Sequence, residues 1–319
     1  MIAVRRFLVL LTALALATGC SQGASNTGAT SGQPPRVLAA ESFLADITQH
    51  VAGDRLTVDV LIPAGIDPHG FEPTPADVRK VADSDLLIIN GAGLEAFLER
   101  LLENAGGERV VVEASAGLTS REPHAAEAVD EAADDHADEA DHAHGENDPH
   151  FWLDPNLVLT YVANIRDGLS KADPSGSAVY AANAEAYSEQ LRALDAWIRQ
   201  QVETIPPQQR LLVTNHESLG YFAERYGLAI VGSLLSTVTT SASPSVQDMA
   251  RLIDQIRATG ARAIFVETGG NPQLARQVAQ DTGARLVENL NTHTVAAGAA
   301  PTYIDMMRQL VTTIVTALS

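Results

Sequence analysis

Residues 173–205, which read DPSGSAVYAANAEAYSEQLRALDAWIRQQVETI, decide the fold. Asp173 suits the N-cap position and Pro174 the first position of a helix. No further proline occurs before the Pro206-Pro207 pair, and the segment is rich in residues that favour helices. About thirty residues at roughly 1.5 Å each make a helix of about 45 Å, close to three times the mean length. We therefore expect one linking helix between two domains, with two helices broken near Asn183 as the alternative.

On both sides of the linking segment, short apolar runs alternate with helical patterns. This alternation favours parallel sheets covered by helices, and 319 residues are enough for two domains. We predict an α/β fold of two lobes, each a mostly parallel sheet with flanking helices, over residues 36–172 and 206–319. The expected strands are 36–40, 56–62, 86–90, 110–112, 211–214, 229–232, 263–266 and 285–287, and the expected helices are 41–51, 76–82, 94–102, 217–226, 245–259, 272–281 and 301–318.

Residues 1–20 predict a secretion signal and not a part of the fold. Arg5 and Arg6 precede an apolar stretch of 13 residues, which is too short to span a bilayer. The stretch ends in Ala17-Thr18-Gly19-Cys20, which resembles a bacterial lipobox and contains the single cysteine of the chain. We expect lipid on Cys20, with residues 21–35 as a flexible tether to a membrane on the extracytoplasmic side, at the cell surface or in the periplasm. Ordinary signal cleavage with a free thiol is the alternative.

The chain is acidic, with a formal charge of −19 at pH 7. Such a surface repels phosphate backbones, which excludes nucleic acid as a partner. Residues 117–148 form the most acidic segment: from residue 121 onward it holds eleven carboxylates and one arginine. We predict a disordered loop here, because the segment has too little apolar surface to bury. We expect weak auxiliary metal binding by its histidines, with a merely solubilising loop as the alternative; these residues are His124, His136, His142 and His144.

Four further histidines share a different setting. His69 and His150 stand in identical Asp-Pro-His tripeptides, while His216 and His293 follow predicted strands of the second lobe. Ligands of open α/β sheets bind beyond the carboxyl ends of the strands, so these side chains can converge on a cleft between the lobes. Four imidazoles suit tetrahedral Zn²⁺. The remaining histidine, His50, lies at the end of a helical pattern and predicts no ligand.

Three stretches of the sequence carry a resemblance to a known family. Residues 67–75 (DPHGFEPTP) and 82–95 (ADSDLLIINGAGLE) look like the signature of the zinc/manganese substrate-binding lipoproteins of bacterial metal ABC transporters, the cluster A-I solute-binding proteins. Residues 148–155 (DPHFWLDP) resemble the second histidine motif of that family, and residues 215–222 resemble the third. The similarity runs from about residue 36 to the C-terminus.

The resemblance implies two α/β lobes joined by one long rigid helix, with a metal ion held between them. It implies metal ligands at His69, His150 and His216, the last being a position where many manganese binders have a carboxylate. The fourth ligand position, commonly aspartate in manganese binders, aligns with His293.

Two carboxylates compete with His293 for the fourth position. They are Glu267 and Glu217, for which hydrogen bonding or work at the domain interface is the alternative role. A site of neutral imidazoles without a carboxylate favours Zn²⁺ over Mn²⁺.

We therefore expect a receptor, not an enzyme, that captures Zn²⁺ between two lobes and delivers it to an ABC permease for import. A receptor for manganese or another divalent metal is the alternative within the family. A zinc hydrolase with Glu217 or Glu267 as general base is the alternative from another class, although the sequence has no HExxH motif. The expected partners are the permease, the membrane that holds the lipid anchor and an auxiliary metallochaperone, and the expected state is a monomer.

Overall fold

The computed structural model describes residues 34–121, 147–240, 243–298 and 300–319, and residues 34–319 form one compact unit. The predicted signal sequence, Cys20, nearly all of the predicted tether and the four loop histidines lie outside the described residues. Within the described ranges, no helix is both long enough and apolar enough to cross a membrane.

The N-terminal lobe is a four-stranded parallel sheet with the strand order β2-β1-β3-β4. Its two central strands are buried throughout, whereas the edge strands alternate between half-buried and exposed residues, as expected for a sheet covered on both faces at its centre. The strands are β1 Val37–Ala39, β2 Val58–Val60, β3 Leu86–Ile89 and β4 Val110–Glu113, and the helices are α1 Ser42–Ala52, α2 Pro75–Asp83, α3 Leu98–Ala105 and α4 Val158–Ala172.

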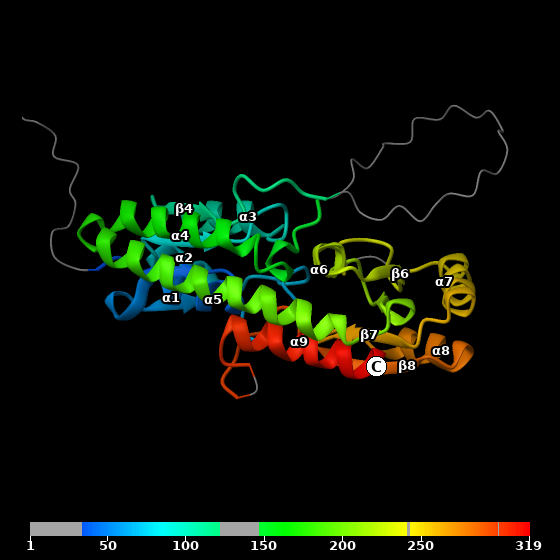
Figure 1. Cartoon of the computed structure of the whole chain (residues 1–319). Helices are drawn as coiled ribbons and strands as arrows, with labels where there is room; N and C mark the ends of the chain where they lie inside the picture. Colours follow the sequence, from blue (N-terminus) through cyan, green and yellow to red (C-terminus); the bar gives the residue numbers. More distant parts are fainter. Residues whose placement is uncertain (1–33, 122–146, 241–242, 299) are drawn as a thin grey trace, which may run out of the picture. The chain divides into compact units, whose positions relative to one another are not determined.

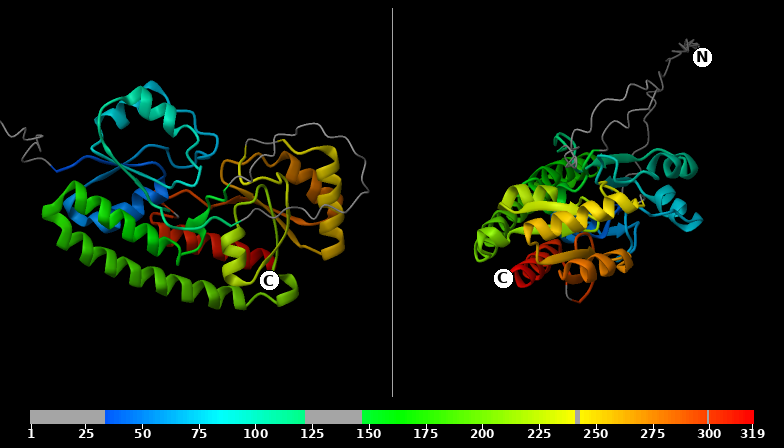
Figure 2. Two further views of the ribbon diagram at one scale, coloured as in Figure 1. Left: turned by 90° about the horizontal axis from the view of Figure 1, so that it is seen from above. Right: turned by 90° about the vertical axis from the view of Figure 1, so that its right-hand side faces the viewer.

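The C-terminal lobe repeats this topology with the strand order β6-β5-β7-β8, again all parallel. Figure 2 shows the two sheets side by side, each with its own helices. The strands are β5 Leu211–Thr214, β6 Ala229–Ser233, β7 Ala263–Glu267 and β8 Arg285–Leu290, and the helices are α6 Gly220–Tyr226, α7 Val246–Thr259, α8 Gln273–Thr282 and α9 Tyr303–Leu318. The predicted fold class is confirmed.

One helix, α5 (Ser177–Glu203), joins the lobes and passes along both of them (Figures 1 and 2). Its 27 residues correspond to about 40 Å, and it is unbroken at Asn183, whose side-chain amide donates a hydrogen bond to the carbonyl of Val51. Its buried residues recur every three or four positions, which presents one continuous stripe to the core.

The start of this helix differs from the prediction. Pro174–Gly176 form a short 3-10 turn, so the α-helix begins at Ser177 and Asp173 does not cap it. The carboxylate of Asp173 instead binds the guanidinium of Arg55 and accepts a hydrogen bond from Tyr180. These bonds fasten the first turn of the linking helix to the N-terminal lobe.

Two other helices begin later than their apolar patterns predict. The turn before α3 is held by Glu95, whose carboxylate accepts hydrogen bonds from the backbone N–H groups of Asn90 and Gly91. The segment before α6 is held by Glu217, whose backbone N–H donates to the carbonyl of Thr237. Helix α4 is absent from the predicted helices, although its buried residues have helical spacing.

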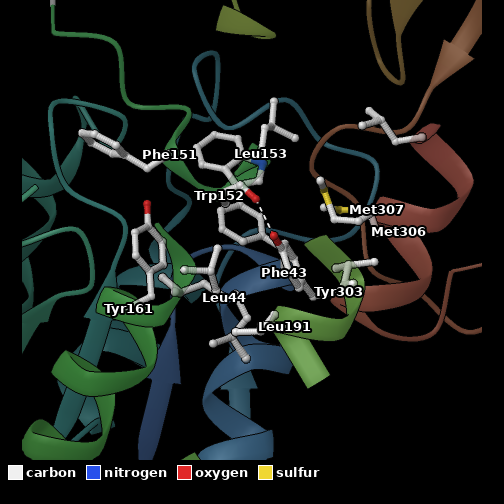
Figure 3. Packing of buried hydrophobic residues seen from close by; sticks show 14 of the residues in the cluster. Phe43, Leu44, Phe151, Trp152, Leu153, Tyr161, Leu191, Tyr303, Met306 and Met307 are labelled. Carbon is white, nitrogen blue, oxygen red and sulfur yellow. Dashed lines mark hydrogen bonds between the residues drawn. The ribbon is translucent and has the colours of Figure 1, made fainter. Parts of the chain in front are cut away.

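The lobes share one hydrophobic core, which runs through α1, α4, α5 and α9 and reaches both sheets. Figure 3 shows its centre, where the ring of Phe43 stacks on Trp152 with 4.6 Å between centroids. The hydroxyl of Tyr303 at the start of α9 donates to the carbonyl of Trp152, and the indole N–H of Trp152 donates to the carbonyl of Thr292. The segment that carries His150 is therefore tied to the loop that carries His293.

Candidate metal centre

Four histidines lie around one cavity of about 340 Å³, three of them on loops that follow strands. His69 lies on the loop after β2, and His150 precedes the 3-10 turn Phe151–Leu153 that leads into α4. His216 follows β5 by two residues, and His293 follows β8 by three. All four predicted residues line this cavity.

Three of the four imidazoles meet directly. The Nε2 atom of His150 lies 3.1 Å from Nε2 of His69 and 3.2 Å from Nε2 of His216. Zn–N bonds of about 2.0–2.1 Å in a tetrahedron put neighbouring nitrogens about 3.3–3.4 Å apart. The separations therefore suit three ligands of one small cation. Among the described residues, no carboxylate and no other histidine joins this group.

Buried carboxylates fix the rings of two of these histidines. Oδ1 of Asp148 lies 2.8 Å from Nδ1 of His150, and Oε1 of Glu267 lies 3.2 Å from Nδ1 of His216. For His150 this acceptor keeps the hydrogen on Nδ1 and leaves a lone pair on Nε2, whereas Nδ1 of His216 also lies 3.2 Å from the side-chain amide nitrogen of Asn215. The lone pair of His150 then points at the other two rings, an arrangement that a cation stabilises.

Asp67 acts differently from Asp148, although both precede a Pro-His pair. Its carboxylate accepts a hydrogen bond from the backbone N–H of His69 (2.9 Å) and another from the hydroxyl of Thr240 in the C-terminal lobe (2.6 Å). It therefore holds the loop and bridges the lobes.

The cavity favours neutral histidines. Burial, followed by the neighbouring imidazoles, lowers the pKa of His69 far below its ordinary value. Burial also lowers the pKa of His216 and of His293. Burial by itself raises the pKa of Glu267, but the nearby His216 and the hydroxyls of Ser218 and Thr292 more than offset this, so its pKa lies below the ordinary value. Neutral imidazoles are the form that binds metals.

His293 lines the same cavity without joining the close group of three. Its Nδ1 atom lies 3.1 Å from the hydroxyl of Thr292, while its Nε2 atom is buried and has no hydrogen-bond partner among the residues that the structure describes. Its loop is held in place by other bonds, since the carbonyl of His293 accepts a hydrogen bond from Ser42. The predicted convergence of four imidazoles is thus a close trio with the fourth beside it.

The competing carboxylates have other contacts. Glu267 lines the cavity and accepts hydrogen bonds from Ser218 and Thr292, whereas Glu217 is buried and does not line the cavity. His50 lies apart from the site, stacked on Tyr187 with 4.4 Å between ring centroids. Sequence reasoning did not single out Ser218, Thr292 or Thr240; for the first two, the available signal was their position within two residues of a histidine of the site.

Comparisons with known proteins show the family of this chain. Residues 37–317 match the model of the family described as zinc-uptake complex component A, periplasmic. The chain is 35% identical over 316 residues to the manganese-binding lipoprotein of Halalkalibacterium halodurans, covering 98% of this chain and 97% of the relative. It is 29% identical over 307 residues to the manganese ABC transporter substrate-binding lipoprotein of Streptococcus pneumoniae serotype 4, covering 94% of each.

Solved structures show the same fold. The manganese-bound periplasmic metal-binding protein of Candidatus Liberibacter asiaticus superposes with a TM-score of 0.75 at 31% identity, covering 89% of this chain and 100% of that one. The periplasmic zinc-binding protein of Treponema pallidum gives a TM-score of 0.76 at 26% identity, covering 90% and 100%.

These matches are to transporter receptors and not to enzymes, so the receptor hypothesis is confirmed and the zinc-hydrolase hypothesis is wrong. The predicted family resemblance is likewise confirmed. The chain belongs to the zinc-uptake complex component A family, the extracytoplasmic substrate-binding receptors of metal ABC transporters.

Proposed function

We propose that this receptor captures Zn²⁺ with His69, His150 and His216, with His293 as the fourth ligand, and delivers it to its permease for import. The observation that carries the proposal is the trio of imidazoles whose Nε2 atoms lie 3.1 and 3.2 Å apart without a carboxylate among them. Related proteins are named for manganese and for zinc, so the donor set of this chain is the argument for the metal.

The donor chemistry favours zinc. Imidazole suits Zn²⁺, whereas carboxylate, carbonyl and water suit Mn²⁺, and at a given nitrogen site zinc binds more tightly than manganese. The N···N separations by themselves fit any small first-row cation. Copper binds such sites more tightly than zinc, so its exclusion in the cell depends on metal availability.

The fourth ligand is proposed from an unsatisfied atom. The Nε2 atom of His293 is buried at the cavity without a hydrogen-bond partner, a state that costs about 1–3 kcal/mol for a buried polar group. A metal ion drawn toward it satisfies that atom and closes a tetrahedral sphere of four nitrogens.

The remaining parts of the chain serve the same function in this proposal. Lipid on Cys20 and the tether 21–35 keep the receptor at the membrane, as a monomer beside the permease. The loop histidines gather or buffer zinc before it reaches the cavity, either directly or from an auxiliary metallochaperone.

The test is a calorimetric zinc titration of residues 21–319 beside a copy that lacks residues 122–146. This deletion leaves Arg121 and Asp148 in place, and the two are already joined by an ion pair of 3.3 Å. We expect one tight zinc site in both proteins, loss of that site in the His216→Ala variant, and weaker binding of manganese.

Two results would contradict the proposal. Tight binding that disappears with the loop would move the site to the loop histidines. A site that survives the deletion but binds manganese more tightly than zinc would make the protein a manganese receptor with an unusual set of ligands.

A further inference from the structure

We propose that Glu267 is a positioning residue of the metal centre, which acts on His216 through a contact at Nδ1 and on His293 through the hydroxyl of Thr292, while its own carboxylate stays out of the ligand set. The proposal rests on the zinc function proposed above. Glu267 is the last residue of β7 and is only 5% exposed. Its place at a strand end beside the cavity gives it a fixed backbone.

Both carboxylate oxygens of Glu267 are engaged. Oε1 accepts a hydrogen bond from the hydroxyl of Ser218 (2.5 Å), and Oε2 accepts one from the hydroxyl of Thr292 (2.5 Å). Short bonds to a carboxylate are among the stronger hydrogen bonds in proteins. Rotation of the carboxylate toward a metal would break at least one of them.

The two neighbours of Nδ1 of His216 favour opposite tautomers, and Glu267 favours the one that binds metal through Nε2. Two groups lie 3.2 Å from the Nδ1 atom of His216, the side-chain amide nitrogen of Asn215 and Oε1 of Glu267. The amide of Asn215 is oriented by its oxygen, which accepts the backbone N–H of Glu267, so its nitrogen can only donate. When the hydrogen is on Nδ1, Glu267 is the acceptor, and Nε2 carries the lone pair that faces His150.

A second set of bonds leads from Glu267 to His293. The hydroxyl of Thr292 has one hydrogen, which it donates to Glu267, so toward the Nδ1 atom of His293 at 3.1 Å it is an acceptor. This places the hydrogen of His293 on Nδ1 and leaves the lone pair on the buried, unpartnered Nε2 atom. The carboxylate therefore sets the tautomer of His293, and beside His216 it is the acceptor that the metal-binding tautomer needs.

The same arrangement bears on metal preference. A dication among neutral imidazoles gains from a negative charge behind the rings, because an anionic acceptor makes imidazole a stronger donor. Since the carboxylate is held outside the ligand set, the ion meets nitrogen only, and the cavity favours zinc over manganese.

The experiment compares the full mature chain with its Glu267→Gln variant, which keeps the shape of the side chain and removes its charge. Zinc and manganese dissociation constants are measured by chelator competition, and Co²⁺ absorption spectra report the ligand set. We expect the zinc dissociation constant to rise about 10- to 100-fold, the Co²⁺ spectrum to keep its form, and the ratio of manganese to zinc dissociation constants to fall. Glu288→Gln is the matched control, a carboxylate on neighbouring β8 that pairs with Arg276 at the surface.

Two results would overturn the inference. A zinc dissociation constant within about threefold of the parent protein means that Glu267 does not position the ligands. A Co²⁺ spectrum altered by Glu267→Gln means that Glu267 is itself a ligand.

If Glu267→Gln fails to fold, Ser218→Ala takes its place. This variant removes one hydroxyl from the carboxylate, and we expect a smaller loss of zinc affinity, up to about 10-fold. No loss would overturn the inference. The His216→Ala variant is run in parallel, since unchanged zinc binding there contradicts the proposed function itself and not only the role of Glu267.

Discussion

The two Asp-Pro-His tripeptides, residues 67–69 and 148–150, are identical in sequence and differ in structure. Both aspartates accept the backbone N–H of their histidine, but Asp148 is fully buried and also contacts the ring of His150, whereas Asp67 is half-buried and also reaches Thr240 of the other lobe. The second tripeptide thus holds its histidine by contacts within one lobe and is the fixed half of the site. The first tripeptide is the dependent half, because its position depends on the contact between the lobes. A tripeptide specifies a candidate ligand, while its surroundings decide how firmly the ligand is held.

Removal of the imidazoles tests this difference most strongly. His150 contacts both other rings of the trio, so we expect His150→Ala to lower zinc affinity by more than the 10- to 100-fold typical of outer partners. We expect His69→Ala to leave measurable binding, because His150, His216 and His293 remain. Chelator competition measures both constants, and equal losses would contradict the division into a fixed and a dependent half.

Neutralisation of the two aspartates is the next test. We expect Asp148→Asn to weaken zinc binding about 10- to 100-fold, because it removes the anionic acceptor behind His150. Asp67→Asn keeps an acceptor for the backbone N–H of His69, so its effect on affinity should be within about threefold, an estimate below the range for ring partners. If the two variants lose affinity equally, the tripeptides have the same role.

A smaller effect concerns the rate of zinc release. Thr240→Val removes the hydroxyl that joins the lobes through Asp67, and the net value of one hydrogen bond predicts release about 2- to 12-fold faster. Stopped-flow transfer of zinc to a coloured chelator measures this rate. Thr282→Val, which changes a hydroxyl bonded within α8, is the control, and equal rates in the two variants would mean that the contact with Asp67 does not retain the metal.

The smallest expected effect is on how the stability of the folded protein depends on pH. It concerns buried carboxylates that support residues 148–150. The side-chain amide of Asn90 donates to the carbonyl of Pro149, and Glu95 holds the turn at Asn90. Burial, followed by the charge of Glu95, raises the pKa of Glu41 well above its usual value. The folded protein therefore keeps a proton that the unfolded chain releases above about pH 4.5, so this contribution to stability is lost as pH rises.

Thermal unfolding of the metal-free protein between pH 5 and 9 checks this sign. We expect the Glu41→Gln variant to lose less stability than the parent protein as pH rises, because it has no proton to release at this position. Glu99→Gln, which changes an exposed carboxylate on α3, should follow the parent protein. An identical pH profile for the Glu41 variant would show that the buried pair does not control this dependence.

The features that the sequence predicts correctly depend on local pattern. The run of helix-forming residues between Pro174 and Pro206 predicts the linking helix, and alternating apolar segments predict both sheets. The histidine motifs bring His69, His150 and His216 into the same cavity.

The features that it misses depend on partners distant in sequence. The linking helix starts late because Asp173 is engaged by Arg55, which lies 118 residues away. The hydrogen-bonding role of Glu267 depends on Thr292, and the bridging role of Asp67 depends on Thr240. No periodicity or spacing reveals such pairs, because they form only when segments distant in sequence have folded together, within one lobe for the first two pairs and between the lobes for Asp67 and Thr240.

The bonds that hold Asp148 in place have an evolutionary consequence. The hydroxyl of Tyr221 accepts the backbone N–H of Arg121 and donates to the carbonyl of Asp148, while the guanidinium of Arg121 pairs with the carboxylate of Asp148. The two ends of the intervening segment are thus fixed independently of what lies between them. Insertions and deletions between residues 121 and 148 can accumulate without displacing His150, so the length and histidine content of that segment are free to diverge among lineages while the metal centre stays the same.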